Sequence, residues 1–155
     1  MKKVLAFDFG ASSGRAILGT FDNGKITLEE LHRFSNDPVS VNGHFYWDVL
    51  RLFHEIKQGI LACSAAGHKD IAAIGIDTWG VDFALIDKDG EMLANPYHYR
   101  DFTQENMNSA IEELGKENIY SKTGIQFLTF NTIFQFYYLK KNKPEIFDRA
   151  EHFLM

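Results

Sequence analysis

Residues 8–15 read Asp8-Phe9-Gly10-Ala11-Ser12-Ser13-Gly14-Arg15, a polar stretch with two glycines and two serines. It lies between the apolar runs Val4–Phe7 and Ala16–Leu18, and an Asn23-Gly24 pair follows the second run. Because Asn-Gly between apolar runs is a strong hairpin signal, we expect the stretch to join two strands of one antiparallel hairpin. A Rossmann fingerprint or a Walker A loop would open a helix instead, so neither pattern is matched.

The loop also carries groups that bind phosphate. Gly10 and Gly14 allow positive φ and close approach of a polyanion to the backbone, and successive amides can form a concave anion site. Both serines add hydroxyl donors, and Arg15 can hold a phosphate in its guanidinium fork. Asp8 beside a phosphate indicates Mg²⁺, bound through water. The alternative interpretation is a polar β-turn with a surface arginine.

Periodicity and turn residues predict an α/β chain. The expected strands are Lys3–Phe9, Arg15–Asp22, Lys25–Phe34, a buried strand Ile71–Asp77 and an extended segment Val81–Ile86. Ser35–His44 is expected to be a polar loop, and Asp87–Gly90 a turn. The expected helices run from the N-cap Asp48 to Gly67, from Asp101 or Thr103 to Leu114, from Lys116 to Lys122 and from Thr132 to Lys141. Aromatic residues crowd the last helix and are expected to be core.

A second informative stretch, Gly75-Ile76-Asp77-Thr78-Trp79-Gly80-Val81-Asp82-Phe83, lies where an apolar strand is expected to end. Ligand sites in sheets covered by helices gather at strand ends. Trp79 could cover the apolar face of a sugar, Gly80 could admit a hydroxyl to the backbone, and Asp82 could accept hydrogen bonds from hydroxyls. The alternative is a core tryptophan with carboxylates in a solvated turn.

Arg100-Asp101 follows Tyr97-His98-Tyr99, and an Arg-Asp pair among aromatics could fix a polyol. The alternative is a surface ion pair of little energetic value. Gln126 and Phe127 are weaker candidates of the same kind, and Asn131 is equally a candidate helix cap.

Together these stretches resemble the FGGY group of carbohydrate kinases, within the actin, Hsp70 and sugar-kinase superfamily, and most of all its members that act on L-rhamnulose. The resemblance extends over essentially all 155 residues, including Asn42–Asp48 and Gly124–Phe127. It implies a ribonuclease-H-like, actin-like ATPase fold: a mixed sheet with three leading antiparallel strands and helices on both faces. Residues 1–155 are then expected to form an incomplete N-terminal domain, with a C-terminal domain absent from this chain.

The resemblance further implies transfer of the γ-phosphate of ATP, with Mg²⁺, to the 1-hydroxyl of L-rhamnulose. Expected at the phosphates are Asp8, Gly10, Ala11, Ser12, Ser13, Gly14 and Arg15, with Asp8 also near the Mg²⁺. Expected at the sugar are Asp77, Thr78, Trp79, Gly80, Asp82, Arg100, Asp101 and Gln126. The catalytic base of the family is an Asp beyond this stretch, so the chain alone is expected to be inactive. The alternatives are a kinase for fuculose, xylulose, ribulose or glycerol, or a non-enzymatic actin-like regulatory module.

The net charge, the cysteine content and the lengths of the apolar runs bear on the partners and on the location of the chain. The net charge of −5 gives no footprint for nucleic acid and no reason to bind anionic membrane. The single cysteine, Cys63, excludes an internal disulfide and is expected to be a buried thiol. No run approaches the ~18 apolar residues of a membrane span, and no signal peptide is expected, so the default location is the cytoplasm. The six histidines show no metal-ligand spacing.

Overall fold

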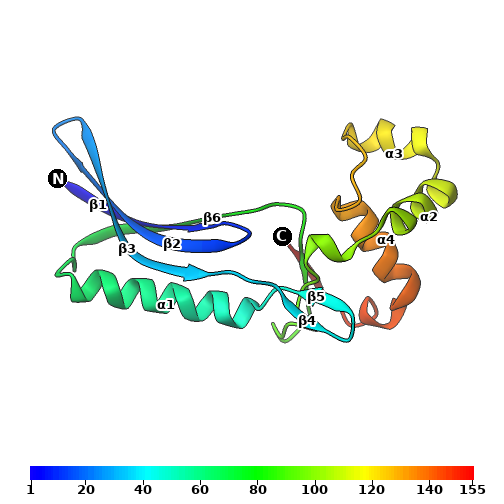
Figure 1. Cartoon of the computed structure of the whole chain (residues 1–155), viewed down its shortest axis with the longest axis horizontal. Coiled ribbons are helices and arrows are strands. Elements are labelled where there is room, and N and C mark those ends of the chain that lie inside the picture. Colours follow the sequence, from blue (N-terminus) through cyan, green and yellow to red (C-terminus); the bar gives the residue numbers. More distant parts are fainter. The chain divides into compact units, whose positions relative to one another are not determined.

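The computed structural model describes all 155 residues, which divide into two compact units (Figure 1). Unit one comprises Met1–Asp37 and Asp48–Trp79, and unit two comprises Pro38–Trp47 and Gly80–Met155. The chain therefore passes from one unit to the other at three places. None of its helices is long and apolar enough to cross a membrane.

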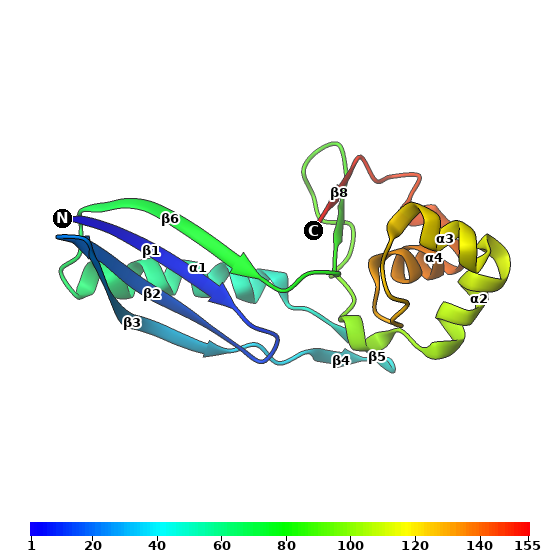
Figure 2. The same ribbon diagram turned by 90° about the horizontal axis from the view of Figure 1, so that it is seen from above.

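Unit one is a four-stranded mixed sheet with one helix, α1 (Val49–Ala65), against one face. The strands are β1 (Lys2–Phe9), β2 (Ser13–Asp22), β3 (Lys25–Ser35) and β6 (Ile71–Thr78). Their order is β3-β2-β1-β6, and Figure 2 shows β6 alongside β1. β1 pairs antiparallel with β2, β2 antiparallel with β3, and β1 parallel with β6. The α/β class and the three leading antiparallel strands are thus confirmed.

The core of unit one follows from the alternation of the strands. Leu5, Phe7 and Phe9 of β1 are buried, as are Ala16 and Leu18 of β2. They form one cluster with Cys63 of α1, which confirms the expected buried thiol. Burial raises the pKa of the Cys63 thiol, as expected for an unreactive cysteine.

The helix comes close to the sheet at Gly59. A Cβ at this position would lie 2.5 Å from the Phe7 ring and 2.8 Å from the Ala16 Cβ. The absence of a side chain at residue 59 therefore sets how near the helix lies to β1 and β2.

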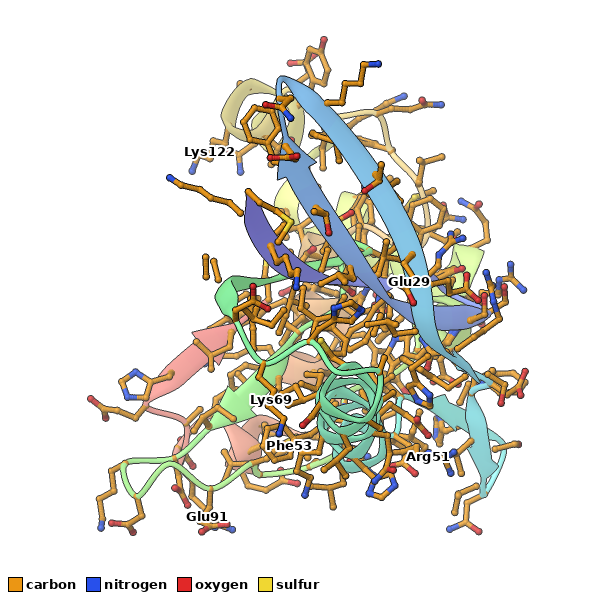
Figure 3. The ribbon with its side chains drawn as sticks, turned by 90° about the vertical axis from the view of Figure 1, so that its left-hand side faces the viewer. Glu29, Arg51, Phe53, Lys69, Glu91 and Lys122 are labelled. Atoms are coloured by element: carbon orange, nitrogen blue, oxygen red, sulfur yellow. The ribbon has the colours of Figure 1, made fainter.

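Both predicted ends of α1 are confirmed. The Asp48 carboxylate accepts from the Arg51 amide at 3.0 Å, and Gly67 follows the C-cap with φ of +86°. Figure 3, which looks along α1, shows Arg51 and Phe53 on opposite flanks of the helix. Phe53 is 60% exposed, whereas the Arg51 guanidinium binds Glu55, which is itself only 3% exposed.

A hydrogen bond to the buried Glu55 carboxylate joins α1 to β3. The Glu55 carboxylate lies 2.6 Å from His32 Nε2 and also accepts from Arg51. Burial by itself raises the pKa of Glu55, but the hydrogen bonds from His32 and Arg51 outweigh burial and lower that pKa below its ordinary value. The carboxylate is therefore held in its charged form against the sheet.

Strand β6 differs from its prediction. An apolar run such as Ile71–Ile76 indicates a strand covered on both faces, but the strand is at the edge of the sheet. Ile74 is 52% exposed and Ile76 is 57% exposed. The reason is positional, since β6 is the outermost strand and neither Ile74 nor Ile76 is part of the cluster that packs against α1.

Unit two holds short strands and most of the helices. Its elements are β4 (Val39–Val41), β5 (His44–Tyr46), β7 (Ala84–Ile86), η1 (Tyr99–Asp101), α2 (Gln104–Leu114), α3 (Lys116–Thr123), α4 (Thr132–Asn142), η2 (Pro144–Ile146) and β8 (His152–Leu154). β4 pairs with β5 and β7 with β8, both antiparallel. The three predicted helices are confirmed, and Thr103 begins α2 with a capping box to Asn106.

The predicted aromatic core of α4 is confirmed only in part, because Tyr137 and Tyr138 are half-buried and Phe136 is 36% exposed. Phe134 is fully buried and clusters with Met107, Ala110 and Ile119. Tyr138 packs against the second cluster of the unit, which includes Phe83 and Tyr97.

The predictions for one loop and for one extended segment are wrong. Ser35–His44 is not only a loop, because it contains β4 and the start of β5, joined at Asn42-Gly43 with φ of +51° and +79°. The second Asn-Gly pair of the sequence thus forms a hairpin turn, as Asn23-Gly24 does between β2 and β3. The segment Val81–Ile86 is extended only from Ala84, because Val81 has φ of +73°.

We predict that Gly59→Ala destabilises the chain. Alanine favours a helix interior by about 1 kcal/mol over glycine, but overpacking against Phe7 and Ala16 costs about 1–3 kcal/mol. The expected net loss is about 1 kcal/mol in the free energy of unfolding, measured by urea denaturation. Gly75→Ala is the matched control, since a Cβ there meets nothing within 4 Å. Equal stability of the Gly59 variant and the wild type would contradict the packing argument.

Candidate functional site

The loop between β1 and β2 is a closed turn held from β3. The Gly10 amide donates to the Ser13 carbonyl at 2.9 Å. Asn36, which directly follows β3 and is 6% exposed, donates from its amide to Ser12 O at 3.0 Å and from Nδ2 to Gly10 O at 2.9 Å. Sequence reasoning missed Asn36, because no local signal links it to a loop 26 residues earlier.

The role expected of the two loop glycines needs correction. Neither Gly10 nor Gly14 adopts positive φ. A Cβ on Gly10 would lie 2.9 Å from Ser13 O, and one on Gly14 would lie 2.1 Å from the Phe34 ring. Glycine is therefore required by space inside the turn and under the Phe34 ring, and not by a left-handed backbone.

Several hydrogen-bond donors of the loop have no acceptor within the protein. The backbone amides of Ala11 and Ser12 donate to no acceptor in the protein, and the hydroxyls of Ser12 and Ser13 form no hydrogen bond in it. The two amides are adjacent, and Ser12 is exposed. Adjacent free amides with hydroxyls beside them fit the requirements of an anion such as phosphate.

Charged residues line up across the sheet next to this loop. Asp8 lies opposite Arg15 in the β1–β2 pair and opposite Asp77 in the β1–β6 pair. Arg15 Nε donates to Asp8 Oδ2 at 2.9 Å, and each side chain is 41% exposed. The row is on the face opposite α1, because Phe7 and Phe9, the neighbours of Asp8, are in the α1 core.

The carboxylates of Asp8 and Asp77 fit a magnesium ion that keeps several waters better than an ion held by protein ligands alone. No group of three or more His, Cys, Asp and Glu side chains in the chain could hold a metal ion. Mg²⁺, however, keeps several waters and is commonly bound by one or two carboxylates together with substrate phosphates. Asp8, with Asp77 next to it, could supply such carboxylates.

The stretch from Asp77 to Phe83 spans the boundary between the units. Asp77 and Thr78 are exposed at the end of β6, and Trp79 is half-buried against the core of unit one. Gly80 is exposed and begins the second part of unit two. A Cβ on Gly80 would meet nothing within 4 Å, so packing within the protein does not require glycine there.

Asp82 has partners inside unit two. Trp47 Nε1 donates to its Oδ2 at 2.5 Å, and Gln135 Nε2 donates to its Oδ1 at 2.9 Å. Trp47 and Gln135 are each 1% exposed. Gln135 was missed from the sequence, because its amide lies on the helical segment that the pattern marks only as aromatic core.

Arg100 and Asp101 do not pair with each other. The Asp101 carboxylate accepts from the Phe45 amide at 2.7 Å and lies 2.8 Å from His44 Nδ1. Arg100 is exposed, and its guanidinium carbon lies 5.6 Å from the centroid of the Tyr99 ring. Gln126 is exposed in the segment between α3 and α4.

The buried His98 side chain contacts the Tyr99–Asp101 turn and Trp47. Its ring is 3% exposed, its centroid lies 4.1 Å from that of Trp47, and its Nδ1 accepts from the Arg100 amide at 3.0 Å. Burial, followed by the nearby Arg100 charge, lowers the pKa of His98. A neutral ring is consistent with an Nδ1 that accepts a hydrogen bond.

Comparison with protein families identifies one match. Residues 3–155 match the model of the FGGY family of carbohydrate kinases, N-terminal domain. The rhamnulokinase of Halalkalibacterium halodurans is 50% identical over 156 residues, covering 100% of this chain and 33% of the relative. The rhamnulokinase of Mannheimia succiniciproducens is 46% identical and covers 98% of this chain and 32% of the relative. The chain thus spans about a third of the length of these curated relatives.

Solved structures show the same fold. The ligand-bound xylulose kinase of Lactobacillus acidophilus superposes with a TM-score of 0.83 at 21% identity, over 99% of this chain and 31% of that chain. The gluconate kinase of the same organism gives 0.81 at 21% identity, over 99% and 31% of the two chains. The expected actin-like α/β fold is thereby confirmed.

The neutral His98 predicts a pH dependence. Because the pKa of His98 is lowered in the folded chain, protonation of His98 favours the unfolded state. The stabilisation by the neutral ring is therefore fully present above the ordinary pKa of 6.5 and is lost as the pH falls toward the pKa of the folded chain. In His98→Asn the amide oxygen can replace Nδ1 as acceptor for Arg100 but does not titrate. We expect the difference in melting temperature between wild type and variant to shift in favour of the variant between pH 7.5 and pH 5. A difference independent of pH would contradict a buried neutral ring.

Proposed function

Because the chain belongs to the FGGY family of carbohydrate kinases, we propose that the protein containing it is a sugar kinase that uses ATP. We further propose L-rhamnulose as the acceptor, phosphorylated at its 1-hydroxyl. The choice of sugar is supported by relatives named rhamnulokinase at 42–50% identity across at least 97% of this chain. The activity is proposed for the complete polypeptide, of whose relatives this chain covers about a third.

We assign the terminal phosphates of ATP to the loop Gly10–Arg15. The observation that carries this assignment is the set of free amides and hydroxyls at Ala11, Ser12 and Ser13, with the Arg15 guanidinium adjacent in sequence. Asp8 would hold hydrated Mg²⁺, which supplies charge neutralisation to the phosphates. Phosphoryl transfer depends mainly on such positioning and neutralisation, which is why a loop of donors suffices on this side of the reaction.

We assign the sugar to Asp77–Asp82, with Arg100, Asp101 and Gln126 as further candidates. Gly80 is the best supported, because it is exposed and the space where its Cβ would lie is open. Asp82 and Asp101 already accept hydrogen bonds within unit two. A carboxylate has about four acceptor positions, so the two bonds to Asp101 leave capacity there for hydroxyls.

Two alternatives remain. Another sugar or polyol kinase of the family, acting on fuculose, xylulose, ribulose or glycerol, differs by the orientation of a few hydroxyls, which the residues named here do not discriminate. A non-enzymatic actin-like regulatory module would need the phosphate loop but no sugar site, and the similarity of the whole chain to relatives named rhamnulokinase disfavours it. We propose the cytoplasm as the location, and ATP and the sugar as the partners.

The first test is sugar-dependent ADP release by the complete polypeptide with Mg-ATP and a panel of L-rhamnulose, L-fuculose, D-xylulose, L-ribulose and glycerol. We expect a strong preference for rhamnulose. Preference for another sugar would overturn the substrate but retain the mechanism, and the absence of any sugar dependence would favour the regulatory module. The isolated 155-residue chain is expected to show no turnover in the same assay.

A second test uses Gly80→Ala in the complete polypeptide. The methyl group projects into space that the protein leaves open, so the free energy of unfolding should change by less than about 0.5 kcal/mol. If the sugar approaches the backbone there, KM for the sugar should rise about tenfold, the equivalent of one lost hydrogen bond. Gly75→Ala, also open, should leave KM unchanged. Unaltered sugar KM in Gly80→Ala would remove Gly80 from the site.

A further inference from the structure

Val81, next to Gly80, holds a backbone conformation that its side chain disfavours. Its φ is +73°, in the left-handed region, where a β-branched residue is a genuine outlier. Of the three non-glycine residues with positive φ, the other two are the hairpin asparagines Asn23 and Asn42. Such a conformation persists only where its surroundings enforce it, and such positions cluster at functional sites.

Two side chains of α4 contact the Val81 carbonyl. Thr132, the first residue of the helix, donates from Oγ1 to the Val81 carbonyl at 2.7 Å. Gln135, one helical turn later, lies with Nε2 3.3 Å from the same carbonyl and 2.9 Å from Asp82 Oδ1. The same nitrogen lies 2.8 Å from Phe130 O, so the amide ties the Val81–Asp82 segment to the start of α4.

The Gln135 side chain is the buried part of this arrangement, whereas Val81, Asp82 and Thr132 are half-buried. Gln135 is 1% exposed, and no buried side-chain nitrogen or oxygen in the chain lacks a hydrogen-bond partner. On the other side of Asp82, the indole of Trp47 donates to the second carboxylate oxygen. Asp82 is therefore fixed by two elements that are far apart in the sequence, and with it the peptide between Val81 and Asp82.

We propose that Thr132 and Gln135 are positioning residues for the sugar: they hold Val81 in its left-handed conformation, so that the Gly80–Val81 backbone presents a preorganised hydrogen-bonding surface to a sugar hydroxyl. This inference rests on the proposed sugar-kinase function. Neither side chain needs to touch the sugar. Their effect passes through the Val81 carbonyl and the Asp82 carboxylate, which they orient.

The experiment uses Thr132→Val and Gln135→Met in the complete polypeptide, since each removes the donor and keeps a similar volume. KM for the sugar should rise about tenfold, as for one lost hydrogen bond, while KM for ATP stays unchanged. A purely structural role would reduce the active fraction, which lowers kcat and leaves both KM values alone. Thr132→Ser retains the hydroxyl and should restore the wild-type KM. Thr129→Val, which alters a threonine whose hydroxyl forms no hydrogen bond in the protein, is the matched control.

A third variant tests the link to Val81. Glycine adopts positive φ without strain, so in Val81→Gly the backbone needs less support. The effect of Thr132→Val on sugar KM should then fall from about tenfold to less than about threefold in a double-mutant cycle. An equal effect in both backgrounds would overturn the proposed route through Val81.

Hydrogen exchange separates failure of this inference from failure of the proposed function. In Thr132→Val, but not in Thr132→Ser, amides in residues 79–83 should exchange faster, whether or not the protein phosphorylates a sugar. Unchanged exchange in Thr132→Val would overturn the proposal even if the kinase activity is found. If exchange is faster in the variant but the wild type shows no sugar turnover, Thr132 still holds the Val81 backbone. The proposed role of that backbone in sugar binding would then be overturned together with the proposed function.

Discussion

Strand β1 is paired along both edges, and its two-residue alternation divides the sheet of unit one into two chemically different faces. Phe7 and its alternating neighbours lie against α1, whereas Asp8 lies on the opposite face beside Arg15 and Asp77. A shift of register by one residue would bury Asp8 and expose Phe7. The hydrophobic packing that holds α1 on the sheet therefore also determines where the charges of the candidate phosphate site lie.

Glycines in this chain serve three different physical purposes. At Gly43 the backbone has positive φ in a tight hairpin, whereas at Gly14 and Gly59 a Cβ would collide with an aromatic ring. At Gly80 neither condition holds, because the φ is ordinary and the space is open. Gly75 also meets neither condition, so Gly80 is central to the sugar assignment because of its place between Asp77 and Asp82.

In unit two, carboxylates expected at the sugar also hold the fold together. Asp82 joins Trp47 to α4 through Gln135, and Asp101 joins the η1 turn to Phe45. Buried hydrogen bonds to a charged acceptor are among the stronger ones in proteins. Replacement of either aspartate would therefore disturb structure as well as binding, and alteration of the supporting side chains is the more selective way to examine the site.

The sequence by itself determined the local elements of this protein: the three leading strands, the helix capped by Asp48, the capping box at Thr103 and the polar loop from Gly10 to Arg15. These depend on neighbouring residues, so pattern and turn chemistry suffice to predict them. The family also followed from sequence, since its motifs are contiguous. Only the tertiary structure decided that β6 is an edge strand, that Gly10 and Gly14 are required by space, and that Asn36 and Gln135 hold the two candidate loops. Each of these depends on atoms brought together from distant parts of the chain, and no local pattern records which partners they will meet.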